Sequence, residues 1–299
     1  MDLCNIGEVR RILEKYGTAP KKGFGQNFLI TPSIPERIAE ESSADAPAHT
    51  CALEIGPGVG ALTQQLSAYY ESVAALEIDR NLLPLLDETL ADCDNVTVVS
   101  GDVMKTDVAK LIDEQFGDRP VDVCANLPYY ITTPVLMKLI DDLPAGKPPR
   151  IRAITVMVQN EVAARICAKP GSDDYGALSV AVAMRGSAEK LFTVSAGHFY
   201  PVPKVSSAVV KITLYPDGPV SVFPELANAP ESAEKLFERA KDICALAFQA
   251  RRKTLSNSLG SRYDKSRVIE ALSEMGKRTD ARGETLSAAE FITLAKKLS

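Results

Sequence analysis

Short apolar runs alternate with amphipathic segments over residues 49–216. The apolar runs cover residues 51–55, 72–78, 96–100, 121–125, 151–158 and 208–214. Between them, apolar residues recur at helical spacing in 61–70, 81–90, 108–116, 134–141 and 160–168. Strands that alternate with helices predict a parallel sheet with helices on both faces, and almost wholly apolar strands are typical of its buried centre. The pattern therefore predicts an α/β fold.

The alternation ends in residues 215–231, which have the composition of a linker because they contain Pro216, Gly218, Pro219, Pro224 and Pro230. Beyond this segment the pattern predicts helices only, over residues 233–250, 265–275 and 287–298. The last of these begins with the capping-box pattern Ser287-x-x-Glu290. We predict a sheet domain over residues 1–216, with an N-terminal arm over 1–48, and a small helical domain over 217–299.

Composition disfavours several classes of site. The 299 residues include only two histidines, and no two of the six cysteines form a C-x-x-C pair. Metal sites, disulfide frameworks and histidine-based triads are therefore not expected. No stretch approaches the roughly 18 apolar residues that cross a bilayer, and residues 1–16 mix charged with apolar side chains, unlike a signal peptide. We expect a cytoplasmic protein without a membrane segment.

The net charge of −5 by itself disfavours nucleic acid as a partner, but the cations are unevenly distributed. Basic segments occur at Lys21-Lys22, at Arg150-x-Arg152 and at 251–253. Residues 248–270 hold six Lys or Arg against two acids, a local charge of +4. Such a segment is either a solvated helix face or a surface that follows phosphates.

Glycines and acids follow three successive predicted strands. The first strand leads into a G-x-G-x-G sequence that contains Gly56 and Gly58 and is preceded by Glu54. Glycine lets the backbone turn sharply and approach a ligand, although a tight strand-to-helix turn needs it too. Glu77, after the second strand, is placed to accept hydrogen bonds from ribose hydroxyls, and Asp102, after the third, to take an adenine amino group. Ligands of open α/β sheets bind at these strand ends.

The glycine spacing also discriminates between cofactors. A dinucleotide site has the sequence G-x-G-x-x-G, with a helix N-terminus beside the pyrophosphate. Here the spacing differs, and acids stand before and after the glycines. This arrangement favours S-adenosylmethionine, which carries a cationic sulfonium, over NAD.

The fourth strand ends in Asn126-Leu127-Pro128-Tyr129. An adenine amino nitrogen is a poor nucleophile because its lone pair is delocalised into the ring. We expect the amide oxygen of Asn126 and the carbonyl of Leu127 to hold its two hydrogens, Pro128 to shape the turn and Tyr129 to stack on the purine. Alignment then supplies most of the rate, without a strong base. The motif predicts methylation of the N6 amino group of adenine, although a proline turn after a buried strand is the plain alternative.

Together these motifs resemble those of the ribosomal RNA adenine dimethylases, in particular the small-subunit enzymes, over about residues 21–259. The likeness also includes K-G-F-G-Q-N-F-L at 22–29, Y-G-x-L-S-V at 175–180 and F-x-P-x-P-K-V at 199–205. It implies a Rossmann-like S-adenosylmethionine-dependent methyltransferase sheet, which makes residues 1–216 the catalytic domain, with a small C-terminal helical domain that binds RNA. The implied reaction is dimethylation of two adjacent adenines near the 3′ end of small-subunit (16S) rRNA in a 30S precursor, with a role in subunit biogenesis. We expect a monomer.

The resemblance also assigns roles to individual residues. The family's cofactor contacts fall on Asn27, Leu29, Gly56, Glu77, Asp102 and Asn126, with Gln26 as a further contact. Asn126, Leu127 and Tyr129 become the adenine-holding residues, and Phe199 becomes an aromatic partner for a flipped base. The residues expected to contact RNA are Lys22, Arg251, Arg252 and Lys253. The chain departs from the family at Asn160, where Lys is usual, and at Ser206, where Asp is usual, which puts substrate contacts in doubt.

Two other functions remain open at this point. One is adenine-N6 methylation of DNA or of large-subunit rRNA; Asn126, in place of the Asp common in DNA enzymes, disfavours it. The other is a non-catalytic assembly or transcription factor that binds S-adenosylmethionine and RNA, against which the intact Asn126, Tyr129, Glu77 and Asp102 argue. The sequence also leaves open whether naked RNA or a partly assembled subunit is the substrate.

Overall fold

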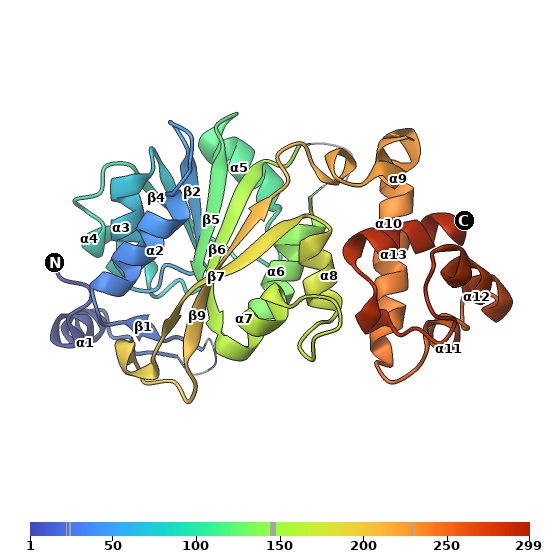
Figure 1. Cartoon of the computed structure of the whole chain (residues 1–299). Coiled ribbons are helices and arrows are strands. Elements are labelled where there is room, and N and C mark those ends of the chain that lie inside the picture. Colours follow the sequence, from blue (N-terminus) through green and yellow to red (C-terminus); the bar gives the residue numbers. More distant parts are fainter. Residues whose placement is uncertain (22, 24, 144–147, 229) are drawn as a thin grey trace. The chain divides into compact units, whose positions relative to one another are not determined.

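A computed structural model describes residues 1–21, 23, 25–143, 148–228 and 230–299 (Figure 1). The chain forms two compact units. The sheet unit comprises Met1–Asp142, Arg150–Ala163 and Glu189–Thr213, and the helical unit comprises Leu143–Pro149, Ala164–Ala188 and Leu214–Ser299. The helical unit therefore includes a mid-chain segment that lies within the range 1–216 expected for the sheet domain.

A seven-stranded sheet has the strand order β4-β3-β2-β5-β6-β9-β7, with helices on both faces (Figure 1). Strands β4, β3, β2, β5 and β6 are parallel to one another, and β9 is antiparallel to β6. The bounds are β2 (Cys51–Ile55), β3 (Val73–Glu77), β4 (Val96–Ser100), β5 (Val121–Asn126), β6 (Ile151–Gln159), β7 (Gly186–Val194) and β9 (Ser207–Leu214). The predicted α/β sheet is confirmed.

The strand order reverses direction between β2 and β5. From β2 the chain adds β3 and β4 on one side, and then returns to place β5 on the other side of β2. In open α/β sheets such a switch point leaves a crevice at the carboxyl ends of the two strands. The residues that follow β2 and β5 are therefore the ones that can meet in a ligand site.

The N-terminal arm, to which the sequence pattern assigned no elements, is ordered around two helices and a short strand. These are α1 (Ile6–Lys15), β1 (Phe28–Leu29) and α2 (Ser33–Ser43). Strand β1 pairs antiparallel with β8 (Phe199–Tyr200), so Leu29 lies opposite Phe199. Helix α1 buries Val9, Ile12 and Leu13 in a cluster with the leucines of α4 and with Phe28. The other helices that begin in this unit are α3 (Ala61–Tyr69), α4 (Leu83–Thr89), α5 (Val108–Phe116), α6 (Thr132–Asp141) and α7 (Asn160–Cys167), and η2 (Ala196–His198) is a 3₁₀ turn.

The helical unit contains the three C-terminal helices expected from the sequence. Its helices are α8 (Ala177–Ala183), α9 (Pro224–Ala227), α10 (Pro230–Gln249), α11 (Leu255–Ser258), α12 (Lys265–Glu274) and α13 (Ala288–Lys297), with 3₁₀ turns at η3 (Pro219–Ser221) and η4 (Gly283–Thr285). A buried cluster that includes Phe237, Leu272 and Phe291 forms its core. The capping box of α13 is present, since Ser287 and Glu290 exchange hydrogen bonds between side chain and backbone. Among the described residues, no helix is long and apolar enough to span a bilayer.

Candidate active site

A pocket lies at the carboxyl ends of β2, β3, β4 and β5, where the strand order reverses. Its walls come from the loops that follow these strands and from the arm segment before α2. The structure brings together in this pocket every cofactor residue expected from the sequence, namely Gln26, Asn27, Leu29, Gly56, Gly58, Glu77, Asp102 and Asn126. Leu127, Pro128 and Tyr129 line it as well.

The glycine loop after β2 needs glycine for two different reasons. Gly56 and Gly58 have φ angles of 73° and 61°, in the left-handed region where a side chain is disfavoured. A Cβ at Gly58 would lie 3.0 Å from Cε1 of Phe28, whose ring is buried. A Cβ at Gly56 would have no neighbour within 4 Å. Gly58 therefore lets the arm pack onto the loop, whereas Gly56 leaves open space on the pocket wall.

Glu77 ends β3 as a buried carboxyl group. It accepts hydrogen bonds from the amides of Gly58 (3.3 Å) and Asp79 (2.7 Å). Burial raises its pKa, although these amide hydrogen bonds oppose the shift. The two contacts fix the carboxyl group relative to the glycine loop, where it is placed to accept hydrogen bonds from a ribose.

The arm is tied to the end of β3 through Asp79. This buried carboxylate accepts a hydrogen bond from Lys21 Nζ at 2.8 Å and lies 3.5 Å from Nε2 of Gln26. Burial acts to raise the pKa of Asp79, but the hydrogen bonds, that from Lys21 first, outweigh it and the pKa is lowered. Lys21, which belongs to a basic segment of the sequence, is engaged with a buried carboxylate.

Glu54, the acid that precedes the glycines, is 1% exposed. Burial raises its pKa to about 8, although Thr63 opposes the shift, so the carboxyl group is largely neutral at pH 7. The sequence interpretation used Glu54 as a negative charge that favours a sulfonium. In the cofactor-free protein, isolation from water therefore favours the protonated form of this carboxyl group.

Asn126 ends β5, and its side chain has one defined partner. Its Nδ2 donates a hydrogen bond to the carbonyl oxygen of Asn27 at 3.0 Å. This bond fixes the amide so that Oδ1 remains an acceptor, and no described protein group donates to it. The backbone N–H of Leu127 donates to Met157 O on β6 (3.3 Å) and fixes the Asn126–Leu127 peptide. The carbonyl oxygen of Leu127, in the peptide that follows, has no donor among the described residues. Two neighbouring acceptors thus stand at the pocket.

Tyr129 is held at its outer end. Its hydroxyl lies 2.8 Å from Oγ of Ser207, the first residue of β9, and burial raises its pKa. The ring is partly exposed in the pocket wall. The hydrogen bond keeps the ring in place, so that its face is available for stacking.

Phe199 does not lie in the pocket. Its side chain is 1% exposed and packs in a core cluster with Leu29, Ile38 and Val209. The sequence interpretation made Phe199 the aromatic partner of a flipped base, but in this structure its ring stabilises the contact between β8 and the arm.

The predicted RNA-contacting residues differ in their surroundings. Lys22 lies outside the described residues. Arg251 donates to the carbonyl oxygens of Asp173 and Tyr175, both at 2.8 Å, and so holds a loop of the helical unit. Arg252 and Lys253 are exposed, and their side chains have no hydrogen bond or ion pair within the described part of the chain.

The basic segment before and within β6 is not a free phosphate-binding surface. Arg150 forms ion pairs with Asp113 (3.1 Å) and Asp118 (3.5 Å). Arg152 forms an ion pair with Asp122, which is 1% exposed. The acidic partners of Arg150 and Arg152 lie 30 or more residues earlier in the chain, so the local sequence pattern does not display these ion pairs.

The two departures from the family pattern are neighbours in space. The amide of Asn160 donates to the carbonyl of Ser206 at 3.1 Å, at the junction of β6 and β9. Oδ1 of Asn160 accepts a hydrogen bond from Lys190 Nζ at 2.8 Å. Neither Asn160 nor Ser206 lines the pocket.

The residues present fit S-adenosylmethionine. The ends of β3 and β4 carry the carboxyl groups of Glu77 and Asp102, which could accept hydrogen bonds from ribose hydroxyls and an adenine amino group. The wall at Gly56 has open space in which a Cβ would meet no protein atom within 4 Å. Leu29 and Val103 add apolar surface. The donor, acceptor and apolar groups of the pocket are thus those that a nucleoside with an amino-acid tail requires.

Comparison with known proteins agrees with this geometry. The family model described as ribosomal RNA adenine dimethylase matches residues 17–299. Proteins named ribosomal RNA small subunit methyltransferase A from Alkaliphilus metalliredigens and Bacillus thuringiensis are each 42% identical. The matches cover 99% of this chain and 98% and 97% of the relatives.

Two solved structures have the same fold. The 23S rRNA methyltransferase ErmE is 25% identical with a TM-score of 0.65, over 91% of this chain and 99% of that chain. A dimethyladenosine transferase from Plasmodium falciparum is 23% identical with a TM-score of 0.68, over 89% and 95%. Because the family model covers nearly the whole chain and the curated relatives are 42% identical over almost their full length, the protein belongs to the ribosomal RNA adenine dimethylase family.

Proposed function

We propose that the protein uses S-adenosylmethionine to dimethylate the N6 amino groups of two adjacent adenines near the 3′ end of small-subunit rRNA. The observation that carries the proposal is the orientation of Asn126, whose Nδ2 is engaged with the carbonyl of Asn27, so that Oδ1 is an acceptor beside the pocket. The small-subunit substrate is supported by the names of the relatives that are 42% identical. ErmE, named for 23S rRNA, is only 25% identical.

The chemistry needs an amino nitrogen whose lone pair is released from the ring. Oδ1 of Asn126 and the carbonyl oxygen of Leu127 each accept one hydrogen of the adenine amino group and favour a pyramidal nitrogen. Tyr129 stacks on the purine and holds the nitrogen in line for attack. S-adenosylmethionine, when bound, supplies the electrophilic methyl group. The alkylated nitrogen is acidic and loses its proton without a strong base.

Two methylations of one nitrogen are compatible with this pair of acceptors. After the first transfer the nitrogen retains one N–H, which either acceptor can hold, and the new methyl group takes the place of the other hydrogen. The geometry at the end of β5 is therefore compatible with a second transfer to the same nitrogen.

A base within a duplex cannot reach such a pocket, so the adenine is flipped out or already unpaired. The exposed Arg252 and Lys253 support phosphate contact by the helical unit. The proposed substrate is a precursor of the 30S subunit, and the methylation is proposed to take part in its biogenesis. The enzyme is proposed to act as a monomer in the cytoplasm.

The experiment is incubation of the protein with methyl-labelled S-adenosylmethionine and unmethylated small subunits, followed by mapping of the labelled nucleotides. Label should appear as N6,N6-dimethyladenine at two adjacent positions near the 3′ end. Label confined to DNA or to large-subunit rRNA would contradict the substrate, and the absence of any transfer would favour a binding factor.

A pair of variants tests the role of the amide. Asn126→Ala should lower the rate of transfer by about 100-fold or more, as removal of a catalytic hydrogen-bonding group does, while RNA affinity is retained. Asn95→Ala is the matched control, because Asn95 also donates from its amide to backbone carbonyls, those of Ser67 and Tyr70, but lies outside the pocket. Equal rates in the two variants would contradict the assignment.

A further inference from the structure

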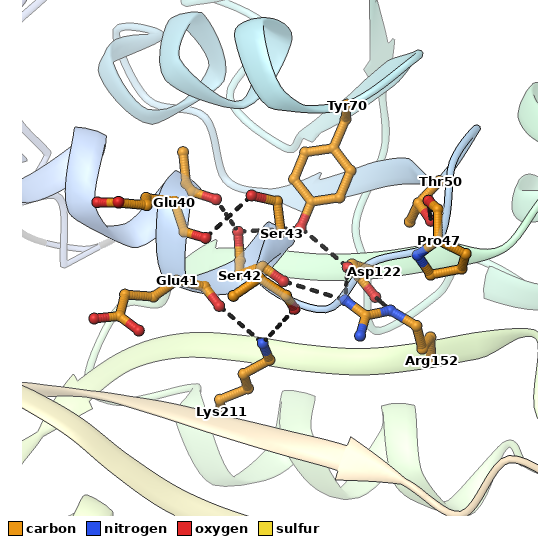
Figure 2. A network of polar contacts seen from close by, with 12 residues as sticks. Glu40, Glu41, Ser42, Ser43, Pro47, Thr50, Tyr70, Asp122, Arg152 and Lys211 are labelled. Carbon is orange, nitrogen blue, oxygen red and sulfur yellow. Dashed lines mark hydrogen bonds and ion pairs between the residues drawn. The ribbon is translucent and has the colours of Figure 1, made fainter.

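A largely buried polar network lies at the C-terminal end of α2 (Figure 2). It joins two cations, one carboxylate and two hydroxyl groups, contributed by Ser42, Tyr70, Asp122, Arg152 and Lys211. None of these residues lines the pocket. Nothing in the proposed chemistry uses them, yet removing the buried Lys211 and the partly buried Arg152 from water is unfavourable unless both are well paired. The contacts of these two cations with the end of α2 explain why they are placed there.

The two cations act as a cap for α2 that is supplied by the sheet. The last carbonyl groups of a helix have no partner within it, and α2 has no basic residue in its last turn. Lys211 on β9, 6% exposed, donates from Nζ to the carbonyls of Glu41 (2.8 Å) and Ala44 (3.1 Å). Arg152 on β6 donates to the carbonyl of Ser42 at 3.2 Å. Figure 2 shows both side chains reaching the same helix end.

The carboxylate of Asp122 fixes one of the two caps. It accepts from Nε of Arg152 at 2.9 Å and from Nη2 at 2.5 Å, a two-point contact that sets the plane of the guanidinium. The hydroxyl of Tyr70, which follows α3, donates to Asp122 at 3.0 Å and lies 3.1 Å from Oγ of Ser42. Strands β5, β6 and β9 are thus joined to the ends of α2 and α3 by polar contacts with defined directions.

The other end of α2 leads to the pocket. Strand β1 directly precedes α2, and its Leu29 lines the pocket and pairs with β8. Ile30 N donates to His198 O at 2.9 Å. Immediately before β1, the carbonyl of Asn27 accepts the hydrogen bond that orients Asn126. Because a helix is stiff along its axis, the place of its last turn constrains the place of its first turn.

We propose that Lys211 and Arg152 are positioning residues for the cofactor pocket. By holding the last turn of α2 on the sheet, they fix the arm segment Gln26–Leu29 as the pocket wall and Asn27 as the partner of Asn126. The inference rests on the proposed function only in taking this pocket as the S-adenosylmethionine site.

The test compares Lys211→Met with the parent protein. Methionine keeps an apolar stem of similar length and removes both hydrogen bonds from Nζ, without leaving a carboxylate unpaired. We expect the Kd for S-adenosylmethionine and for S-adenosylhomocysteine, measured by calorimetry without RNA, to rise about tenfold. Amide hydrogen exchange should become faster in α2 and at Ile30. In the methylation assay the KM for the cofactor should rise with it, while kcat at saturating cofactor stays within about twofold. Lys211→Arg, which keeps donors, should restore most of the affinity.

Two controls separate positioning from a general loss of stability. Ile112→Val removes a buried methyl group from α5, outside the network and the pocket, and Arg150→Met removes ion pairs that do not involve α2. Both should leave the cofactor Kd unchanged. If Lys211→Met lowers the melting temperature but binds the cofactor as tightly as the parent, the inference is wrong.

A milder variant covers the case in which Lys211→Met does not fold. Arg152→Lys keeps the charge beside Asp122 but donates from a single nitrogen, so the Kd should rise about threefold; an unchanged Kd would overturn the inference. Failure of the parent protein to bind S-adenosylmethionine would overturn the proposed function instead. The two failures are therefore distinguishable.

Discussion

Alanine substitutions at Gly58 and Gly56 should have different effects, although both residues are in the left-handed region. A side chain in that region costs about 1–2 kcal/mol, which applies to both positions. Only at Gly58 would the new Cβ also meet the buried ring of Phe28, at 3.0 and 3.1 Å. Overpacking of this kind typically costs about 1–3 kcal/mol. We expect Gly58→Ala to destabilise the sheet unit by about 3 kcal/mol and Gly56→Ala by about 1 kcal/mol.

Cofactor binding should distinguish the same pair in a second way. The added methyl group of Gly56→Ala lies in open space on the pocket wall, where it competes with the ligand. The variant should therefore bind S-adenosylmethionine at least about tenfold more weakly despite its small loss of stability. Native-state hydrogen exchange of the β2 amides measures the stability of the unit that contains both glycines, and calorimetry measures the Kd.

A second substitution tests the contact with the ring. Phe28→Leu removes the planar ring, so Gly58→Ala should destabilise the Phe28→Leu background by less than it destabilises the parent, a non-additivity of about 1 kcal/mol or more. Equal losses in the two backgrounds, or equal losses for Gly56→Ala and Gly58→Ala, would refute the account of the loop.

Glu54→Gln should stabilise the cofactor-free protein increasingly as pH rises. Burial raises the pKa of Glu54 to about 8 from about 4.3 in an unfolded chain. The stability of the parent protein is therefore complete below pH 4 and falls toward pH 8, by up to about 1.4 kcal/mol per pH unit. A constant difference between the melting temperatures of the parent and the variant over this pH range would contradict the prediction. Tyr129→Phe removes one hydrogen bond, worth about 1 kcal/mol, and should leave single-turnover methyl transfer within about threefold, whereas Tyr129→Ala removes the stacking face and should slow transfer at least about tenfold. Asn160→Lys should lower stability by about 0.5 kcal/mol, because the new lysine is repelled by Lys190 of β7, which contacts Asn160 in the parent. Ser206→Asp, added to this variant, should restore the lost stability. Strictly additive melting-temperature changes in the double-mutant cycle would count against a pairing of the new lysine with the new aspartate.

The sheet and the ends of its strands could be predicted from the sequence because the strands are nearly uniform in polarity. Strands β2 and β5 are buried along almost their whole length. Strand β2 is followed by glycine, and β5 ends at the first residue of Asn-Leu-Pro-Tyr. Strand β7 was missed because most of its residues are at least partly exposed and include Glu189 and Lys190. Its place at the edge of the sheet, which no local pattern reveals, explains that composition.

The arm residues of the pocket became candidates only through the family resemblance. Gln26 and Asn27 carry no periodicity or spacing that points to a ligand, and they reach the pocket because Lys21 is bonded to Asp79 and β1 pairs with β8. The orientation of Asn126 likewise depends on a backbone carbonyl that is distant in sequence. These contacts are set by tertiary packing, which the sequence does not display.

The errors in the candidate site have one physical origin. An arginine or an aromatic ring looks the same in a sequence whether it is exposed or buried. Arg152 stands in a basic segment of the sequence, but its partner Asp122 lies on the neighbouring strand beneath α2. Phe199 was assigned to the base, but its ring fills the core behind Leu29. In both cases the decisive information is burial, which depends on segments far apart in the chain.

The central claim is that two neighbouring acceptors at the end of β5 hold an adenine amino group in front of the cofactor. The most direct measurement is a crystal structure with S-adenosylhomocysteine and an adenosine nucleotide. The account predicts the N6 nitrogen within hydrogen-bonding distance of Oδ1 of Asn126 and of the carbonyl oxygen of Leu127, with the cofactor sulfur on the far side of that nitrogen. Purine density away from the end of β5, or a cofactor bound outside the pocket lined by Glu77 and Asp102, would contradict it.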